Sequence, residues 1–450
     1  MKLIYFIAAI VLISSCTKDI TSDTPDTPKP KFKVEIVSGN QQNGFINQEL
    51  GNPIIIKVTN PEGVPYNWAN ISFITSDGNL LSQNGKFLSG TYLTYWMLGC
   101  KEGIQKASVI VSDTAGKPID TLQISANVAK DTPWNRVCGL SVKVDGYKFY
   151  LSNVRQIIEH PDGTIYTLLT SYSDILLYSS TDNGENWTEI FNCTAYRHVH
   201  DLILDESGNF FLSTDKGLFK SSDCKNWKKV LDAMINKCFS VDNQTLFAND
   251  FLFKTIYRSD DKGETWIKAP ISHLNEFNAR WYSENIRQVK KIDSNKILLL
   301  DGNKDLLLSK DNGKTWEFFT NTSQFLDKTG FIIKNNDIYL VNITGGESIP
   351  EVYKSDVTNV SWSLFCTLRH TPHTSDDIQE IASSTDNLYF LTSSCIFKVN
   401  QNGDTLNVTN NIWSKMVNIN NFLVSKQGFF LVGSDYSDGK GIFRSKLSNP

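Results

Sequence analysis

The sequence predicts an all-β protein in which an N-terminal β-sandwich is followed by a seven-bladed β-propeller. Three observations lead to this fold class. Residues 32–130 alternate short β-rich runs with turn residues. An eight-residue motif recurs in the rest of the chain, and its tryptophans are 39 to 50 residues apart, about the length of one four-stranded propeller blade. The chain is also 40% hydrophobic and 12% aromatic, which excludes a mostly disordered protein.

The first 31 residues are predicted to target and tether the protein. Residues 1–15 place one Lys before an apolar run, as in a secretory signal peptide, and the run is too short to span a bilayer. Small residues directly precede Cys16, which resembles the lipobox of bacterial lipoproteins and implies that Cys16 is lipidated. Residues 16–31 are polar and Pro-rich, so we expect an extended tether. The alternative is an ordinary secretory signal with a coincidental Cys.

The predicted location is the outer membrane, with the cell-surface and periplasmic orientations both open. Lys18 and Asp19 resemble a weak form of the export signal of Bacteroidetes surface lipoproteins. A formal net charge of −4 argues against nucleic acid as a partner. Seven cysteines follow Cys16 without a CxxC pair, so we expect scattered buried thiols, no disulfide framework and no zinc site. No cofactor is predicted, and we expect a monomer.

The domain at 32–130 is predicted to be an Ig-like β-sandwich. Its β-rich runs include Pro53–Val58 and Ala107–Val111. Residues 94–99 (TYWMLG), followed by Gly103, resemble a strand–turn motif of bacterial invasin-type Ig-like domains. We find no catalytic cluster in this part of the sequence. The domain is therefore predicted to be a spacer that lifts the next domain off the membrane, and direct ligand or partner binding is the alternative.

The second domain, residues 135–450, carries the repeated motif S-x-D-x-G-x-x-W. Three copies are complete, a fourth is one residue shorter, and a fifth, at 355–362, has Val357 in place of the Asp. The copies resemble the Asp boxes, or BNR repeats, of sialidases and related β-propellers. The motif residues of the first four copies are Asp182, Gly184, Trp187, Asp223, Trp227, Asp261, Gly263, Trp266, Asp311, Gly313 and Trp316.

The motif is predicted to be structural and not catalytic. An Asp at a hairpin turn accepts hydrogen bonds from backbone N–H groups, and Gly supplies a positive φ. The Trp then packs its large apolar surface beneath the turn. Five of the ten tryptophans are assigned to blade turns in this way.

Seven blades result from aligning the segments around each motif. The predicted blades cover 153–192, 196–232, 235–270, 286–320, 328–366, 377–411 and 417–450. The last blade ends at its third strand, so Cys138–Val144 is predicted to supply its outer strand and close the ring. Six or eight blades are the alternatives.

The loops that lead into each blade share one face of a propeller, and the repeated motifs lie on the opposite face. The loop face concentrates Arg, His and aromatic residues. Its candidate ligand-binding residues are Arg155, Tyr196, His198, His200, Arg280, Trp281, Tyr282, Arg287, Arg369 and His370. Alignment of the inner strands places Arg155, His200, Arg287, Gln379 and Asn420 at equivalent positions near the channel mouth.

This face is predicted to bind carbohydrate, including acidic glycans. Aromatic rings stack on pyranose rings, while Arg and amide groups bind hydroxyls or carboxylates. The alternative is that these Arg and His side chains only bond to neighbouring blades. His198 and His200 alternate on one strand, but a third metal ligand is not evident, so no metal is predicted.

No catalytic set is recognised, so the predicted function is non-catalytic binding of a glycan. A sialidase-like glycoside hydrolase would need an Arg triad and a Tyr–Glu pair, for which Tyr282 and Glu284 are the only nearby candidates. The strand around Arg155 also lacks the Pro of the sialidase R-I-P motif. A propeller lyase that uses His, Tyr and Arg is a second alternative. A third is an assembly factor that binds an envelope or surface protein.

Overall fold

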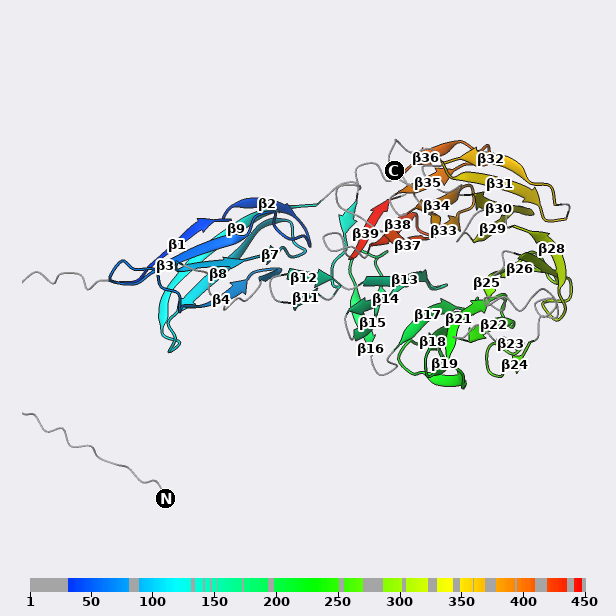
Figure 1. Cartoon of the computed structure of the whole chain (residues 1–450), viewed down its shortest axis with the longest axis horizontal. Helices are drawn as coiled ribbons and strands as arrows, with labels where there is room; N and C mark the ends of the chain where they lie inside the picture. Colours follow the sequence, from blue (N-terminus) through cyan, green and yellow to red (C-terminus); the bar gives the residue numbers. More distant parts are fainter. Residues whose placement is uncertain are drawn as a thin grey trace, which may run out of the picture.

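The structure is a computed structural model, and it contains a β-sandwich and a β-propeller that lie side by side (Figure 1). It describes residues 31–80, 89–130, 134–140, 142–145, 148–151, 153–171, 174–192, 198–250, 255–269, 286–301, 305–322, 330–342, 349–358, 360–368, 378–392, 395–408, 419–434 and 441–446. These residues form strands and no helix, so none of their segments is a helix able to cross a membrane. The predicted all-β fold class is confirmed. The predicted signal peptide and Cys16 lie outside the described residues.

The sandwich packs a three-stranded sheet on a four-stranded sheet. The first sheet has the order β1 (Lys33–Ser38), β3 (Ile54–Thr59), β6 (Thr91–Thr94). The second has the order β2 (Gln42–Phe45), β9 (Pro118–Ala129), β8 (Gly103–Ser112), β4 (Asn70–Thr75). A short pair, β5 (Asn79–Leu80) and β7 (Trp96–Met97), adds to them. Alternate residues of β3 and β8 are buried in one core, because successive side chains of a strand point to opposite faces.

The propeller consists of seven four-stranded antiparallel sheets within the described residues. Blade 1 contains β13 (Asn153–Glu159), β14 (Ile165–Ser171), β15 (Asp174–Ser180) and β16 (Thr188–Asn192). Blade 2 contains β17 (Val199–Leu204), β18 (Phe210–Thr214), β19 (Gly217–Ser221) and β20 (Lys228–Leu231). Blade 3 contains β21 (Ile235–Ser240), β22 (Leu246–Asp250), β23 (Ile256–Ser259) and β24 (Ile267–Lys268). Blade 4 contains β25 (Ile286–Lys291), β26 (Ile297–Asp301), β27 (Asp305–Ser309) and β28 (Glu317–Asn321).

The last three blades complete the ring. Blade 5 contains β29 (Phe331–Lys334), β30 (Asp337–Asn342), β31 (Glu351–Asp356) and β32 (Ser363–Thr367). Blade 6 contains β33 (Ile378–Ser383), β34 (Leu388–Thr392), β35 (Ile396–Val399) and β36 (Thr405–Asn407). Blade 7 contains β37 (Ile419–Val424), β38 (Phe429–Ser434), β39 (Gly441–Lys446) and β10 (Asn135–Arg136). The inner strands contact one another around the ring, including β13 with β37 (Figure 1).

The second strand of each blade is the most apolar part of the propeller. All five residues are buried in β18, β26 and β34. Neighbouring blades cover both faces of such a strand, which therefore reads as a continuous apolar run and not as an alternating one.

The strand that closes the ring is not the one that we predicted. Asn135 and Arg136 pair with Arg444 and Phe443 of β39, whereas the prediction was Cys138–Val144. Residues 142–145 (β11) instead pair with Lys148–Leu151 (β12) in a separate hairpin. The chain leaves the sandwich at β9 and reaches blade 7 within a few residues, so the first residues that arrive form the outer strand.

Cys138 has a different role from the predicted one, because it joins the propeller to the sandwich. It forms a disulfide with Cys100 of the sandwich, which corrects the expectation of scattered thiols. Its backbone also lies on blade 1, since Trp187 N–H donates to Cys138 O at 3.0 Å. Four other described cysteines are buried and belong to no disulfide, namely Cys224, Cys238, Cys366 and Cys395. The disulfide was missed because Cys100 and Cys138 belong to different domains, and only their packing brings them together.

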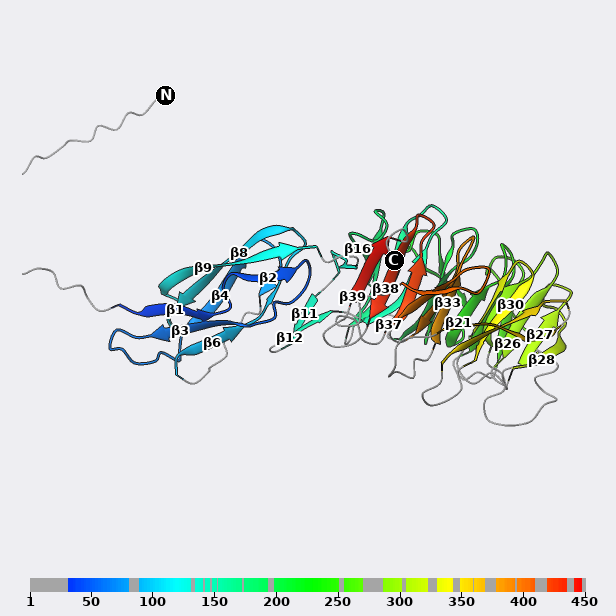
Figure 2. The same ribbon diagram turned by 90° about the horizontal axis from the view of Figure 1, so that it is seen from above.

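Polar contacts reinforce this joint between the domains. The buried Arg136 donates from Nη1 to Asn47 O at 3.0 Å, and Asn47 Nδ2 donates to Val137 O. The Arg136 guanidinium also lies over the Phe443 ring, and burial lowers its pKa to about 10. Arg136 therefore connects the sandwich and the last blade. The first described residues lie at the other end of the sandwich, remote from the propeller (Figure 2).

The repeated S-x-D-x-G-x-x-W turns connect the third and fourth strands and share one hydrogen-bond pattern. In blade 1, Ser180 Oγ donates to Asp182 Oδ1 at 2.8 Å, and Gly184 N–H donates to Ser180 Oγ at 2.9 Å. Trp187 Nε1 then donates to Gly184 O at 3.1 Å. A Cβ at Gly184, which has a φ of 79°, would lie 2.2 Å from the Leu431 side chain of blade 7. The turn of one blade therefore fits closely against the second strand of the preceding blade.

Candidate binding face at the channel mouth

A β-bulge lies at the start of nearly every described inner strand, at the channel mouth. The strand register skips one residue in six of the seven described inner strands. The skipped residues are Arg155, His200, Asn236, Arg287, Gln379 and Asn420. Five of them are the residues that sequence alignment places at equivalent positions. A bulged residue is left out of the ladder, and its side chain is re-aimed.

Four of the ten predicted ligand-binding residues belong to the described part of the chain. These are Arg155, His198, His200 and Arg287. The other six lie outside the described residues: Tyr196, Arg280, Trp281, Tyr282, Arg369 and His370. The site can therefore be built from the inner strands and the short turns next to them.

Blades 1 and 2 bring three of the four residues together around a carboxylate. His200 interacts electrostatically with Asp215, His198 and Arg155. Asp215 lies in the turn between β18 and β19, and its N–H donates to His198 O at 3.2 Å. Burial is the main reason that the pKa of His200 is lowered, and the nearby His198 and Arg155 lower it further. His200 is therefore a neutral imidazole at pH 7, beside an exposed Arg155.

Arg287 lies apart from this cluster. It is the bulged residue of blade 4, whereas Arg155, His198 and His200 belong to blades 1 and 2. Among the described residues, no three His, Cys, Asp or Glu side chains are grouped so that they could hold a metal ion. The Arg155–His198–His200–Asp215 group, which we call the mouth cluster, thus offers charge and hydrogen bonds to a ligand.

In four of the six bulged strands the residue after the bulge links two blades, a feature that we did not predict. Its side-chain oxygen accepts a hydrogen bond from the backbone N–H of the next inner strand. The pairs are Gln156 with Leu202 (2.9 Å), Asp201 with Cys238 (3.3 Å), Gln288 with Phe331 (2.6 Å) and Glu380 with Phe422 (3.1 Å). The recurring Gln, Asp or Glu at the third position of the aligned inner strands is the sequence signal that could have found it.

Two of these acceptors are carboxylates in an environment that favours the protonated form. Burial raises the pKa of Asp201, and it raises the pKa of Glu380 to about 7. Glu380 is exposed at the surface, and its pKa is raised because the surrounding protein weakens the hydration of its carboxylate. Lys237 and Lys290, on blades 3 and 4, interact with Glu380 on blade 6 and lower its pKa. These charges therefore interact across the propeller axis.

The carboxylates have a structural role that needs no proton transfer. Gln156 and Gln288 make the same hydrogen bond to the next blade as Asp201 and Glu380 do. What the position requires is an acceptor oxygen, because a buried backbone N–H without a partner is costly. The raised pKa of Glu380 follows from the weakened hydration of its carboxylate and is not by itself a sign of acid catalysis.

We expect the substitution Glu380→Gln to flatten the pH dependence of stability. The pKa of Glu380 is raised from its ordinary value of 4.5 to about 7 in the folded state. Its contribution to stability is therefore fully present below pH 4.5 and declines as the pH rises towards 7. The amide keeps the acceptor for Phe422 but does not ionise. The free energy of unfolding in urea should be measured between about pH 4 and pH 8.

The exposed Glu62→Gln variant is the matched control for this change, since Glu62 lies on a surface turn of the sandwich. It should keep the wild-type pH profile. A Glu380→Gln variant with the same pH slope as the wild type would show that Glu380 does not titrate in this range.

Comparison with known proteins supports the propeller fold. Residues 151–322 match the family model described as the DUF6242 beta propeller domain. No curated protein matches the chain in sequence. Among solved structures, YCF48 from Cyanidioschyzon merolae is 12% identical with a TM-score of 0.50, and the match covers 70% of this chain and 99% of that chain. At this identity the likeness concerns the fold alone.

Two further structures have lower TM-scores. YCF48 bound to D1 peptide is 12% identical with a TM-score of 0.48, and the match covers 71% of this chain and 96% of that chain. The extracellular domain of a hybrid two component system of B. thetaiotaomicron is 12% identical with a TM-score of 0.48. That match covers 69% of this chain but only 42% of the other chain.

Proposed function

We propose that this protein is a lipid-anchored, non-catalytic binding protein of the outer membrane, and that its propeller binds carbohydrate at the channel mouth. The mouth cluster is the observation that carries the proposal. It places the exposed Arg155 beside the half-buried His200, with His198 and Asp215 around them. A guanidinium binds the hydroxyls or carboxylate of an acidic sugar, and a neutral imidazole can donate or accept a hydrogen bond.

The non-catalytic part of the proposal follows from the account of the inner strands. In the described inner strands, Asp201 and Glu380 are the carboxylates with raised pKa values. Each is engaged with a backbone N–H of the next blade. Neutral Gln residues do the same elsewhere in the ring. A glycoside hydrolase would need carboxyl groups that are available to the substrate.

The remaining parts of the chain are assigned to presentation of the propeller. We propose that the S-x-D-x-G-x-x-W turns are Asp boxes that hold blades together, as their contacts with the preceding blade suggest. The sandwich is proposed to be an Ig-like spacer. Its disulfide to the propeller is consistent with export to an oxidising compartment, where such bonds persist.

Binding at the mouth cluster is tested with the purified full chain on a glycan array, with sugar release monitored. We expect a glycan to be retained, and we expect Arg155→Ala and His200→Ala each to weaken it by about tenfold, since a hydrogen bond to a charged group contributes about 1.5–3 kcal/mol. Asn236→Ala, at the bulged position of blade 3, is the matched control and should bind normally.

Three outcomes would replace this proposal. Sugar release that is lost in Arg155→Ala would favour a glycan-active enzyme. A co-purifying envelope protein, with no glycan retained, would favour an assembly factor. If Arg155→Ala and His200→Ala both retain the glycan as the wild type does, the glycan binds elsewhere than at the mouth cluster.

Lipidation is tested separately by metabolic labelling with palmitate. We expect the label and the membrane association to be lost in Cys16→Ser, because each buried CH₂ of an acyl chain contributes about 0.8 kcal/mol to anchoring. The matched control is Cys366→Ser, a free buried cysteine of the propeller, which should keep the label. An unlabelled wild-type protein would leave an ordinary secretory signal as the explanation.

A further inference from the structure

Six blades have a tryptophan directly before the outer strand, opposite one of the last two residues of the third strand. In blade 1, for example, Ser179 pairs with Thr188, so Ser180 faces Trp187. In blade 7, Arg444 pairs with Asn135, so Ser445 faces Trp134. By the same register the six tryptophans, in blade order, are Trp187, Trp227, Trp266, Trp316, Trp362 and Trp134.

Each indole, or the turn that carries it, packs against the preceding blade. The Trp316 ring of blade 4 lies edge-to-face on Phe247 of blade 3, with centroids 6.0 Å apart. The Trp227 ring of blade 2 lies 6.0 Å from Phe191 of blade 1. In blades 1 to 3 the indole N–H also donates to the carbonyl three residues earlier, at 3.1 Å. We call the boundary between a blade and the blade that precedes it a seam. The seam before each of these six blades is therefore filled by an indole ring.

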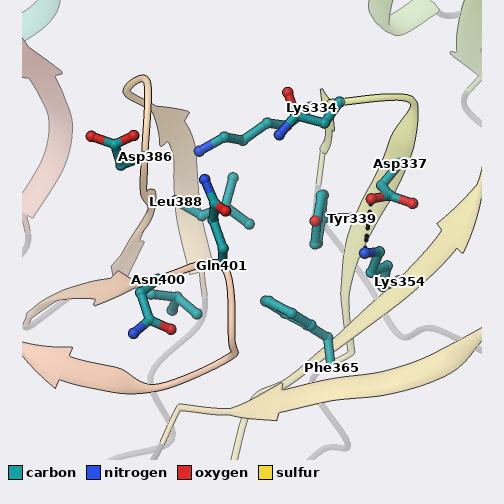
Figure 3. Close-up of a pocket in the computed structure, with 11 residues that line it drawn as sticks. Lys334, Asp337, Tyr339, Lys354, Phe365, Asp386, Leu388, Asn400 and Gln401 are labelled. Carbon is teal, nitrogen blue, oxygen red and sulfur yellow. Dashed lines mark ion pairs between the residues drawn. The ribbon is translucent and has the colours of Figure 1, made fainter.

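Blade 6 lacks this ring, and a cavity lies at the equivalent seam. Val399 ends β35 and pairs with Thr405, which is exposed. By register, Thr405 stands where the other blades have tryptophan. A cavity of about 160 Å³ lies between blades 5 and 6, and Tyr339 and Phe365 of blade 5 are among the residues that line it (Figure 3). Tyr339 of β30 corresponds in position to Phe247 of β22, the ring on which Trp316 packs. We call this position the platform. Blade 5 therefore has an aromatic platform, although blade 6 has no indole to cover it.

The chemistry of the cavity fits an uncharged aromatic ring. Tyr339 and Phe365 meet edge-to-face with centroids 5.2 Å apart, and Leu388 and Val399 are buried beside them. The rim has two lysines and two aspartates, which balance in charge. Lys354 is paired with Asp337 at 2.8 Å, and Lys334 interacts electrostatically with Asp386. The charges are thus internally compensated, and amides of Asn400 and Gln401 complete the rim (Figure 3).

We propose that the cavity between blades 5 and 6 binds an aromatic side chain of a partner protein, inserted where the other six blades hold their own tryptophan. The six filled seams show that this position in the fold accommodates a planar ring. Blade 6 differs from them in lacking the indole and in having Val399 where they have Ser. The site lies at the turns between first and second and between third and fourth strands, so it belongs to the face opposite the mouth cluster. It is independent of carbohydrate binding at the channel mouth.

The test uses the purified full chain and ligand-observed NMR with N-acetyl-tryptophanamide, a neutral indole. Binding is expected in the wild type. Thr405→Trp should fill the seam from within, so we expect binding to be lost and the melting temperature to rise. Thr405→Ala changes the same exposed residue without filling the seam and should bind as the wild type does. Tyr339→Leu replaces the aromatic ring at the platform with leucine. Blades 4 and 7 have leucine at the same position, namely Leu298 and Leu431. This substitution should weaken binding about two- to tenfold, which is the value of one aromatic pair.

Three results would overturn the proposal. The first is no binding of the indole by the wild type. The second is equal binding of the indole by the wild type and Thr405→Trp. If Thr405→Trp does not fold, equal binding by the wild type and Tyr339→Leu takes its place. The third is selective binding of methyl glucoside and not of the indole, which would make the cavity a sugar site. Arg155→Ala should leave indole binding unchanged, so failure of the mouth cluster and failure of this site are distinguishable.

Discussion

Replacing Trp134 with Ala is expected to destabilise the propeller by about 3–5 kcal/mol, the usual effect of removing a buried indole. Trp134 is 5% exposed, and it packs in one core with Tyr389 of blade 6 and Phe430 of blade 7. It also directly precedes β10, the strand that closes the ring. The variant therefore loses core packing and loosens the only strand of blade 7 that comes from the other end of the domain.

The measurement is urea and thermal unfolding of the full chain, followed by circular dichroism. Trp316→Ala, which removes the equivalent indole of blade 4, should show a similar loss without affecting closure. Trp68→Ala is the matched control, because Trp68 is 56% exposed on the sandwich, and a surface change is usually within about 0.5 kcal/mol. A Trp134→Ala variant as stable as Trp68→Ala would mean that blade 7 does not depend on this indole.

Loss of the Cys100–Cys138 disulfide should be the second large effect. The bond closes a segment of 38 residues, for which the chain-entropy model gives about 3–4 kcal/mol. We expect the Cys100→Ser/Cys138→Ser double variant to have a lower melting temperature. We also expect greater motion of the sandwich against the propeller. The joint should not separate fully, because Arg136 and Asn47 still bond across it.

Small-angle scattering and thermal unfolding measure these two effects. The matched control is the wild type under reducing conditions, which should behave as the double variant does. Thiol titration of the non-reduced wild type should find Cys100 and Cys138 protected. Two extra reactive thiols, or an unchanged melting temperature in the double variant, would contradict a bond between the domains.

The sequence alone determined the fold class and the positions of the blades, because both depend on local periodicity. The complete, shortened and altered copies of the S-x-D-x-G-x-x-W motif mark the end of the third strand in five of the seven blades, and the apolar second strands precede them. The bulged residues Arg155, His200 and Arg287 were also aligned correctly, since the inner strands share one pattern.

The tertiary structure decided what depends on residues far apart in the chain. Trp134 and β10 reach blade 7 across some 300 residues, and no local signal marks that partner. The Cys100–Cys138 bond joins two domains, and the interblade hydrogen bonds of Asp201 and Glu380 join neighbouring repeats. The open seam of blade 6 could be recognised only from the pairing of Val399 with Thr405, which places Thr405 where other blades have tryptophan. Local patterns fix elements and repeats, whereas closure, joints and vacant sites are set by the packing of one element against another.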